Sequence, residues 1–415
     1  MGDTEVAAAQ SRGPTGRGRV VACALAAFAV GAYATVAIPA LVPAIERAWG
    51  LGEGRLGGLM AVHIAGSMIG GLMGGWLADR RDRKGVVAAL LLVASMGYGL
   101  AALSLGRVWV LQLGLGLLGL GYGAAFVSGG GLLSVLFPSR RRGSFSILMV
   151  THAAAGIGYP YLVSHLQRLW ELGRLSFDVL LGAPLAMVAL TLAGLGLLLL
   201  RLPLRFPEAP SPSAETPGAR GRRASIAGLI VIVVLATLHG SADAILYQWI
   251  TRFLTVQHPA TPFPAAWVLS FYSTAYLVVR LGLSLLPDRV GRRGFLIVPG
   301  LIAGPLVLLA LRAGSFGGTV TLYIAATCLY GLEFPASMGY AAQRYPARFS
   351  TLFGVVSAFN VTSAGAVWGV GLWIEASGSM VMPLSVSGLG FFAFGLVAAA
   401  WALWEMPRSA EPSRG

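Results

Sequence analysis

Charged residues and cysteines are scarce in this chain of 415 residues, and each shortage excludes some classes of protein. Only 11% of the residues are Asp, Glu, Lys or Arg, while 56% are hydrophobic. Soluble domains seldom combine such values, so the composition excludes an ordinary globular protein and indicates a multi-pass membrane protein. The two cysteines, Cys23 and Cys328, both lie inside apolar segments. They predict neither a disulfide framework nor a metal site.

The sequence also lacks the signatures of enzymes and of nucleic-acid-binding proteins. No Walker sequence, HExxH motif, paired Asp motif or Ser-His arrangement occurs in the apolar segments, so we expect no enzyme activity, no cofactor and no direct use of ATP. The net charge is +14, but Lys and Arg lie almost entirely in short loops between apolar runs. There they set membrane topology and form no groove-reading patch, which excludes nucleic acid as a partner.

Twelve apolar runs are long enough to cross a bilayer. A spanning helix needs about 20 mostly apolar residues, and a backbone in lipid must satisfy its own hydrogen bonds, which favours helices. The runs cover residues 20–45, 55–78, 86–105, 108–137, 144–168, 179–201, 225–253, 265–287, 294–312, 317–342, 350–375 and 382–404. We therefore expect an all-α protein with twelve transmembrane helices.

The basic residues predict the topology. With both termini in the cytosol, 22 of the 30 Lys and Arg lie on the cytosolic side, seven lie on the other side and Arg280 lies within a span. This bias is typical of the cytoplasmic (inner) membrane. Residues 1–19 and 405–415 are then cytosolic tails, and the first apolar run is a retained signal anchor because no cleavage signal follows it.

The two halves of the chain repeat each other. A Pro-, Ser- and Arg-rich linker, residues 202–224, separates six predicted helices in residues 20–201 from six in residues 225–404. Tyr122-Gly123 and Tyr330-Gly331 lie 208 positions apart, as do His152 and Asn360. Repeated halves are typical of secondary transporters, which bind substrate between the halves near the bilayer midplane.

One loop carries a family resemblance. Gly75-Trp-Leu-Ala-Asp79-Arg80-Arg-Asp82-Arg83-Lys84 resembles the signature G-x-L-a-D-R-x-G-R-K of the major facilitator superfamily, with Asp82 in place of the glycine. The resemblance covers about residues 20 to 405, and it implies two pseudo-symmetric six-helix bundles that transport by alternating access. Three stretches, 137–160, 240–249 and 280–293, most resemble the branch of the fucose:proton symporters. Helices 1 and 4 lack the embedded carboxylates of those symporters.

Ionisable side chains within spans are candidate functional residues, because each costs roughly 2.5–3.5 kcal/mol at mid-helix. His239, Asp243 and Tyr247 follow at i, i+4 and i+8, so we expect them on one helix face as a proton or substrate site. The alternative is a hydrated, idle Asp243 near a helix end. Glu333 lies beside Pro335, which should kink the helix; it binds substrate or cation, or it forms a buried pair with a neighbouring helix.

His152 and its repeat partner Asn360 are further candidates for proton coupling or substrate binding, with hydrogen bonding between helices as an equal alternative. His63 is expected to be scaffold, beside a ridge of Gly66, Gly70 and Gly74 for close helix contact. Aromatic residues on the expected lining helices are candidates for stacking on substrate: Tyr33, Tyr122, Tyr330 and Trp368.

Gating is expected at the loop that carries the resemblance and at its weaker copy in the second half. The candidate gating residues are Asp79, Arg80, Arg83, Lys84, Asp288, Arg289 and Arg280. For Arg280, capture of an anionic substrate is the alternative. The embedded acids lie in the second half, so we expect the first copy of the loop to carry more of the gating and the second half more of the coupling.

The sequence thus predicts a monomeric secondary active transporter of a small organic solute, coupled to protons. The alternatives are a proton-driven efflux antiporter of drug-like compounds, and a non-transporting sensor or assembly protein with the same fold.

Overall fold

The computed structural model describes residues 17–78, 80–136, 141–203, 226–259, 264–285, 294–344, 356 and 361–405, and every regular element among them is a helix. In the first half these are α2 (Arg17–Gly31), α3 (Tyr33–Trp49), α4 (Glu53–Ala78), α5 (Arg83–Ala102), α6 (Val108–Leu136), α7 (Arg141–Glu171) and α8 (Phe177–Arg201). In the second half they are α9 (Ile226–Gln257), α10 (Trp267–Leu285), α11 (Gly294–Ala310), α12 (Phe316–Tyr330), α13 (Glu333–Arg344), α15 (Val361–Ser377) and α16 (Val381–Glu405).

These fourteen described helices make twelve segments. Only Ala32 separates α2 from α3, and α12 and α13 are separated by two residues. The prediction of an all-α protein with twelve transmembrane helices is therefore confirmed. Some predicted boundaries were wrong by a few residues: α2 already begins at Arg17, and α16 runs through Glu405. Of the predicted linker, residues 204–224 lie outside the described part of the chain.

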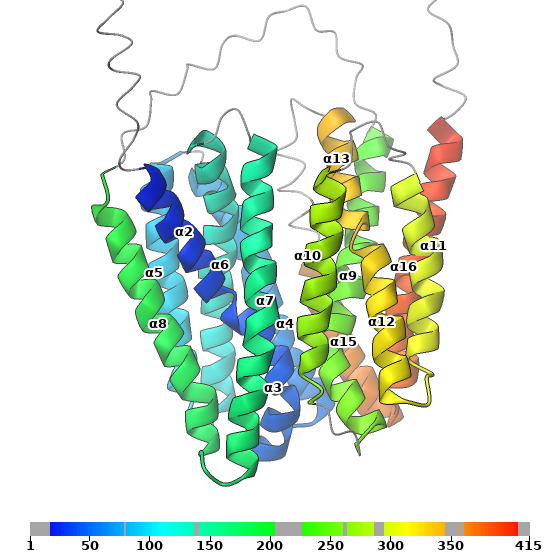
Figure 1. Cartoon of the computed structure of the whole chain (residues 1–415), viewed down its shortest axis with the longest axis horizontal. Helices are drawn as coiled ribbons and strands as arrows, with labels where there is room; N and C mark the ends of the chain where they lie inside the picture. The colour runs from blue at the N-terminus through cyan, green and yellow to red at the C-terminus, as the bar shows by residue number, and fades with distance from the viewer. Residues whose placement is uncertain are drawn as a thin grey trace, which may run out of the picture.

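The helices form two bundles side by side, one from α2–α8 and one from α9–α16 (Figure 1). The start of α2, the end of α8, the start of α9 and the end of α16 lie on the same side, the upper side in Figure 1. We call this the terminal side and the opposite one the far side. Because an even number of spans separates the two ends, both return to one side.

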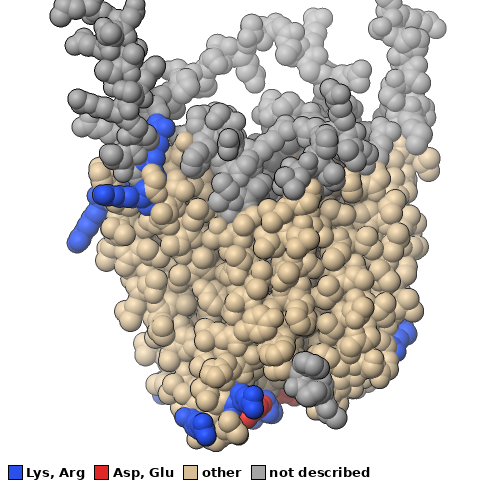
Figure 2. Space-filling model, in the orientation of Figure 1, with Lys and Arg blue, Asp and Glu red and all other residues tan. Residues whose placement is uncertain are grey.

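The outer surface suits a bilayer. Among the described residues, seven helices are long and apolar enough to span a membrane, including Arg17–Trp49 and Val381–Trp404. Figure 2 shows a broad band without charged side chains, with Lys and Arg only near its edges. Large apolar side chains lie exposed on it, such as Leu190 and Met187. In water such a surface would aggregate, whereas lipid covers it.

The break between α12 and α13 follows from Pro335. Proline has no N–H and clashes with the carbonyl four residues earlier, which here belongs to Gly331. Helix α12 accordingly ends at Tyr330, and α13 restarts at Glu333 so that Pro335 occupies its first turn, where a missing N–H costs little. The corresponding α6 in the first half is continuous. The predicted kink is confirmed, as a complete interruption.

The predicted glycine ridge brings α4 and α6 into backbone contact. A Cβ added to Gly66, Gly70 or Gly74 would lie within 2.4 Å of a carbonyl oxygen of α6, and one added to Gly119 or Gly123 of α6 would meet carbonyls of α4 within 2.5 Å. Small residues allow this approach because lipid provides no hydrophobic force between helices, so close packing must hold them together. The prediction of close helix contact is confirmed.

Gly70→Ala should destabilise the protein, because the new Cβ would lie 2.0 Å from the carbonyl oxygen of Leu120. Overpacking of this kind costs about 1–3 kcal/mol, so we expect a lower apparent Tm of the detergent-solubilised protein. Gly75→Ala on the same helix is the matched control, since its Cβ would only touch Val127 at 3.5 Å. Equal Tm values for the two variants would contradict this account of the contact.

Candidate functional site

A buried imidazole and a buried carboxylate meet inside the second half. Nδ1 of His239 on α9 lies 2.9 Å from Oε2 of Glu333, the first residue of α13. The two side chains are 5% and 0% exposed. A contact of this length requires one hydrogen between nitrogen and oxygen, and the N–H of a neutral imidazole or the O–H of a protonated carboxyl can supply it. Oε1 of Glu333 has no hydrogen-bond partner among the described residues.

Aromatic rings enclose this pair. The ring of His239 stacks on Phe334 with centroids 6.1 Å apart, and it meets Tyr330, Phe391 and Phe394 edge-on at 6.0–6.3 Å. Few polar groups therefore lie near enough to replace Glu333 as the partner of His239, or His239 as the partner of Glu333. In such surroundings the two groups depend on each other, because an unpaired buried charge is expensive.

Asp243 has partners that the sequence analysis did not anticipate. Tyr272 of α10 donates to both of its carboxylate oxygens, at 2.8 and 2.9 Å, and Tyr276 donates to Oδ2 at 2.9 Å. The common site of His239, Asp243 and Tyr247 stays a prediction, although each side chain has a nearer partner in this conformation. His239 turns to Glu333, and Tyr247 contacts the ring of Tyr272, 4.9 Å away.

Arg280 completes the row on α10. Tyr272, Tyr276 and Arg280 follow at intervals of four, so they share one helix face; this spacing was the signal in the sequence. The guanidinium of Arg280 lies over the ring of Tyr276, 4.4 Å from its centroid, and the rings of Tyr272 and Tyr276 stack at 4.5 Å. Arg280 is also within electrostatic range of Asp243, and of His152 in the other half. A cation therefore faces the boundary between the halves.

Histidines of the first half lie opposite. Nδ1 of His152 on α7 lies 3.1 Å from the hydroxyl of Tyr122, which donates to the carbonyl of Phe28. Nε2 of His63 lies 3.2 Å from Oγ1 of Thr35. Both histidines thus link helices of the first half, which is the alternative that the sequence left open for His152. Asn360 lies outside the described residues.

The candidate stacking residues have different environments. Tyr33 is buried against Tyr159, with centroids 5.0 Å apart, and Tyr330 stacks on Phe391 at 4.2 Å. The hydroxyl of Tyr122 donates a hydrogen bond to the backbone carbonyl of Phe28. Trp368 is 49% exposed and lines a groove between the halves.

The described cations of the predicted gating loop all contact their own half. Arg80 lies over the ring of Trp76, 4.2 Å from its centroid. Nε of Arg83 donates to the carbonyl of Ala78, and Lys84 donates to Leu202 at 2.7 Å. The contacts of Arg83 and Lys84 place cations at the C-terminal carbonyls of α4 and α8, where the helix dipole favours them. Asp82, which replaces the glycine of the signature, accepts from the N–H of Gly85 and caps α5. Asp79, Asp288 and Arg289 lie outside the described residues.

The halves are joined by an ionic contact on the far side that the sequence analysis missed. Arg252 of α9 reaches Glu46 of α3 at 2.5 Å and Glu53 of α4 at 2.9 Å. One residue before it, Thr251 donates to the carbonyl of Pro39 at 2.5 Å. The only signal in the sequence was the presence of charged residues near predicted helix ends. Pairing between the halves produces no periodic pattern along the chain.

A second line of contacts between the halves joins α7 and α10. Nε1 of Trp267 donates to Oγ of Ser164 at 3.0 Å, and Ser270 donates to the carbonyl of Ile157 at 2.8 Å. Deeper along the pair, Gly156 leaves room for the side chain of Ser273, since an added Cβ would lie 2.3 Å from its hydroxyl. The described hydrogen bonds between the halves thus run from the far side towards the middle.

No three His, Cys, Asp or Glu side chains in the described ranges lie close enough to hold a metal ion.

Comparison with known proteins gives the family. The family model described as Major Facilitator Superfamily matches residues 23–369. A segment of the chain is 35% identical over 140 residues to the 4-hydroxybenzoate transporter PcaK of Pseudomonas putida, covering 33% of this chain and 29% of that protein. Another is 28% identical over 125 residues to the niacin transporter NiaP of Acinetobacter baylyi, covering 30% and 28%. The chain thus matches less than a third of the length of these relatives.

Solved structures share the fold over nearly the whole chain. A bacterial homologue of the human lysosomal transporter Spinster, in an inward-facing and occupied conformation, gives a TM-score of 0.69 at 14% identity and covers 95% of this chain and 97% of its own. A variant of the E. coli fucose:proton symporter FucP gives 0.64 at 16% identity, with 92% and 98% covered. At such identities the likeness concerns the fold alone.

Removal of Arg252 should open the far side. In a chain with Cys23 and Cys328 replaced by Ala, Ser273→Cys places a thiol at the boundary between the halves. We expect Arg252→Ala to increase its labelling by a membrane-impermeant maleimide from the far side, because two ion pairs between the halves are lost. Arg47→Ala is the matched control, since Arg47 pairs with Glu171 at 2.7 Å within the first half. Equal labelling in both variants would show that Arg252 does not hold the far side closed.

Proposed function

The chain belongs to the Major Facilitator Superfamily, and on that premise we propose that it is a secondary active transporter which moves a small organic acid across the cytoplasmic membrane together with protons. The family and the relatives above are transporters and not enzymes. The observation that carries the proposal is the buried pair of His239 and Glu333, two side chains able to gain or lose a proton in the interior of the second half.

The transport mechanism is alternating access. The contacts of Arg252 and Thr251 join the halves on the far side, so substrate can leave or enter there only after these contacts break. The bias of Lys and Arg assigns the terminal side to the cytosol. To open the far side, both ion pairs of Arg252 must break while a substitute closure forms on the terminal side. Arg80, Arg83 and Lys84, with Asp79, Asp288 and Arg289, are the residues proposed for that closure.

Coupling rests on Glu333 and Asp243. Glu333 begins α13, where the helix dipole favours its anion, and its Oε1 lacks a partner among the described residues. A proton taken up there neutralises the carboxylate and so removes the cost of a negative charge held away from water. Asp243, one turn along α9 from His239, is the second acid in electrostatic contact with Glu333. In this proposal, a proton travels only a short path between Glu333, Asp243 and the substrate site.

The substrate class is a small aromatic carboxylate. The named substrates of two relatives, 4-hydroxybenzoate and niacin, are both aromatic acids. In this chain, Arg280 supplies a guanidinium whose planar fork suits a carboxylate, next to the stacked rings of Tyr272 and Tyr276. His152 approaches the same space from the first half. A flat anion beside Arg280, with His152 of the first half on its other side, would touch both halves, as alternating access requires.

Ligand binding tests the substrate class. Saturating 4-hydroxybenzoate or nicotinate should raise the Tm of the purified protein, since a ligand at 100 times its Kd adds about 2.7 kcal/mol to folding stability. Arg280→Gln should remove this shift, whereas Arg312→Gln, an arginine on the far side, should keep it. A shift with glucose or fucose but with neither acid would replace the proposed class by sugars.

Transport in proteoliposomes tests the coupling. Glu333→Gln keeps the shape and a hydrogen bond to His239 but does not ionise, so accumulation of radiolabelled 4-hydroxybenzoate against its gradient, driven by an acidic exterior, should fall to the equilibrium level. Exchange of internal for external 4-hydroxybenzoate should persist. Glu171→Gln, a surface acid of the first half, should accumulate like the unaltered protein. Undiminished accumulation in Glu333→Gln would remove Glu333 from the coupling mechanism.

A further inference from the structure

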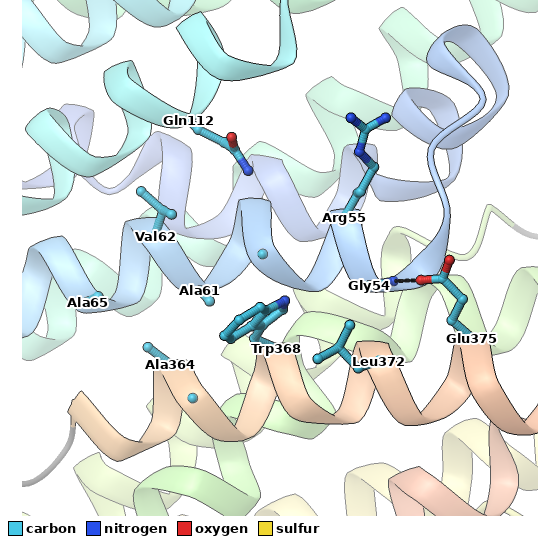
Figure 3. A pocket seen from close by; sticks show the side chains of 12 residues that line it. Gly54, Arg55, Ala61, Val62, Ala65, Gln112, Ala364, Trp368, Leu372 and Glu375 are labelled. Atoms are coloured by element: carbon cyan, nitrogen blue, oxygen red, sulfur yellow. Dashed lines mark hydrogen bonds between the residues drawn. The ribbon is translucent and has the colours of Figure 1, made fainter.

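A groove of about 600 Å³ runs between the two halves on the outer surface, at the far side. Figure 3 shows its walls: α4 on one side, α15 on the other, and Gln112 of α6 above them. It is lined by Gly54, Arg55, Gly58, Ala61, Val62, Ala65, Gln112, Ala364, Gly365, Trp368, Leu372 and Glu375. Neither the proton site nor the proposed substrate site uses these residues.

Small side chains create the groove. Gly58, Ala61 and Ala65 of α4 face Ala364 and Gly365 of α15, so neither wall fills the space between them. A Cβ added to Gly365 would meet nothing within 4 Å. The groove therefore has room for an apolar chain along its floor.

The length of the groove matches one leaflet of a bilayer. Arg55 and Ala65 are ten residues apart on α4, which is about 15 Å along a helix and half of the roughly 30 Å hydrocarbon core. Arg55 and Glu375 lie near the far-side ends of α4 and α15, at the depth of lipid headgroups. From there the groove leads to the middle of the membrane.

The groove is open to lipid. Trp368 and Leu372 are 49% and 46% exposed, and Figure 3 shows the indole of Trp368 between the two helices, below Gln112. Tryptophan is enriched where apolar chains meet headgroups, because its ring is apolar and its N–H is polar. Lipid is thus the surrounding medium of this surface.

Opposite charges stand at the headgroup end. Arg55 is exposed and forms no ion pair with any described residue. Oε2 of Glu375 accepts the N–H of Gly54 at 2.8 Å, across the boundary between the halves, and Figure 3 shows this carboxylate beside Gly54 at the end of the groove. A cation and an anion at headgroup depth complement a headgroup that carries both charges.

We propose that this groove binds one phosphatidylethanolamine molecule, with its phosphate against Arg55, its ammonium against Glu375 and one acyl chain between α4 and α15. The bound lipid touches both halves and strengthens the closed far side. A lipid with phosphate alone would satisfy Arg55 but leave the carboxylate of Glu375 facing an anion, so the site selects the zwitterion.

Native mass spectrometry of the full chain, incubated with equal amounts of palmitoyl-oleoyl phosphatidylethanolamine and phosphatidylglycerol, tests the proposal. The unaltered protein should retain one phosphatidylethanolamine, several-fold in preference to phosphatidylglycerol. Gly365→Leu fills the groove and should reduce retention about tenfold. Gly369→Leu is the matched control: it lies one turn further along the same exposed helix, also has nothing within 4 Å of its added Cβ, and should retain the lipid.

Glu375→Gln separates headgroup recognition from chain binding. It keeps the hydrogen bond to Gly54 but removes the charge, so retention of phosphatidylethanolamine should fall to the level of phosphatidylglycerol. Equal retention of the two lipids by the unaltered protein, or unchanged retention in a folded Gly365→Leu variant, would overturn the proposal. So would a Gly365→Leu variant that keeps its lipid but loses the thermal shift with 4-hydroxybenzoate, because the groove would then serve the solute.

Discussion

A charged group inside a membrane-spanning bundle must find its counterpart within the protein, since water is absent, and this requirement organises the second half of the chain. The carboxyl of Glu333 is reached by His239 alone among the described side chains, and that of Asp243 by the hydroxyls of Tyr272 and Tyr276. The helices that carry these groups are held in register by the pairs as much as by packing. Any change in the protonation of one member therefore changes a contact between helices, which is how a proton can act on conformation.

The sequence predicted what composition and periodicity determine. Apolar runs gave the twelve segments, the glycine spacing on α4 gave its contact with α6, and Pro335 gave the interruption next to Glu333. Each of these depends on residues close together in the chain. For Glu333 the sequence also left open a buried pair with a neighbouring helix, which is the arrangement found.

Partners between helices escaped prediction for a physical reason. Spacing along one helix put His239 beside Asp243, but side chains four residues apart need not turn to each other when a better donor stands on the next helix. Tyr272 and Tyr276 offer Asp243 hydroxyls, and Glu333 offers His239 an acceptor. Likewise, the contact of Arg252 with Glu46 and Glu53 exists only once both halves are assembled, so no local pattern encodes it. The lipid groove also has no signal in the sequence, because it is formed by side chains that are too small to fill it.

The glycine contact has a mechanical consequence. Because the backbones of α4 and α6 are in direct contact, we expect the two helices to bend and rotate together. No side chains lie between them that could absorb a displacement. At its far-side end α4 also approaches the second half: a Cβ on Gly371 of α15 would lie 2.6 Å from the carbonyl of Glu53. Helix α4 is fixed to α6 and also contacts α15, so it can transmit a tilt of the second half to the first. We therefore expect α4 and α6 to move as one unit when one half turns against the other.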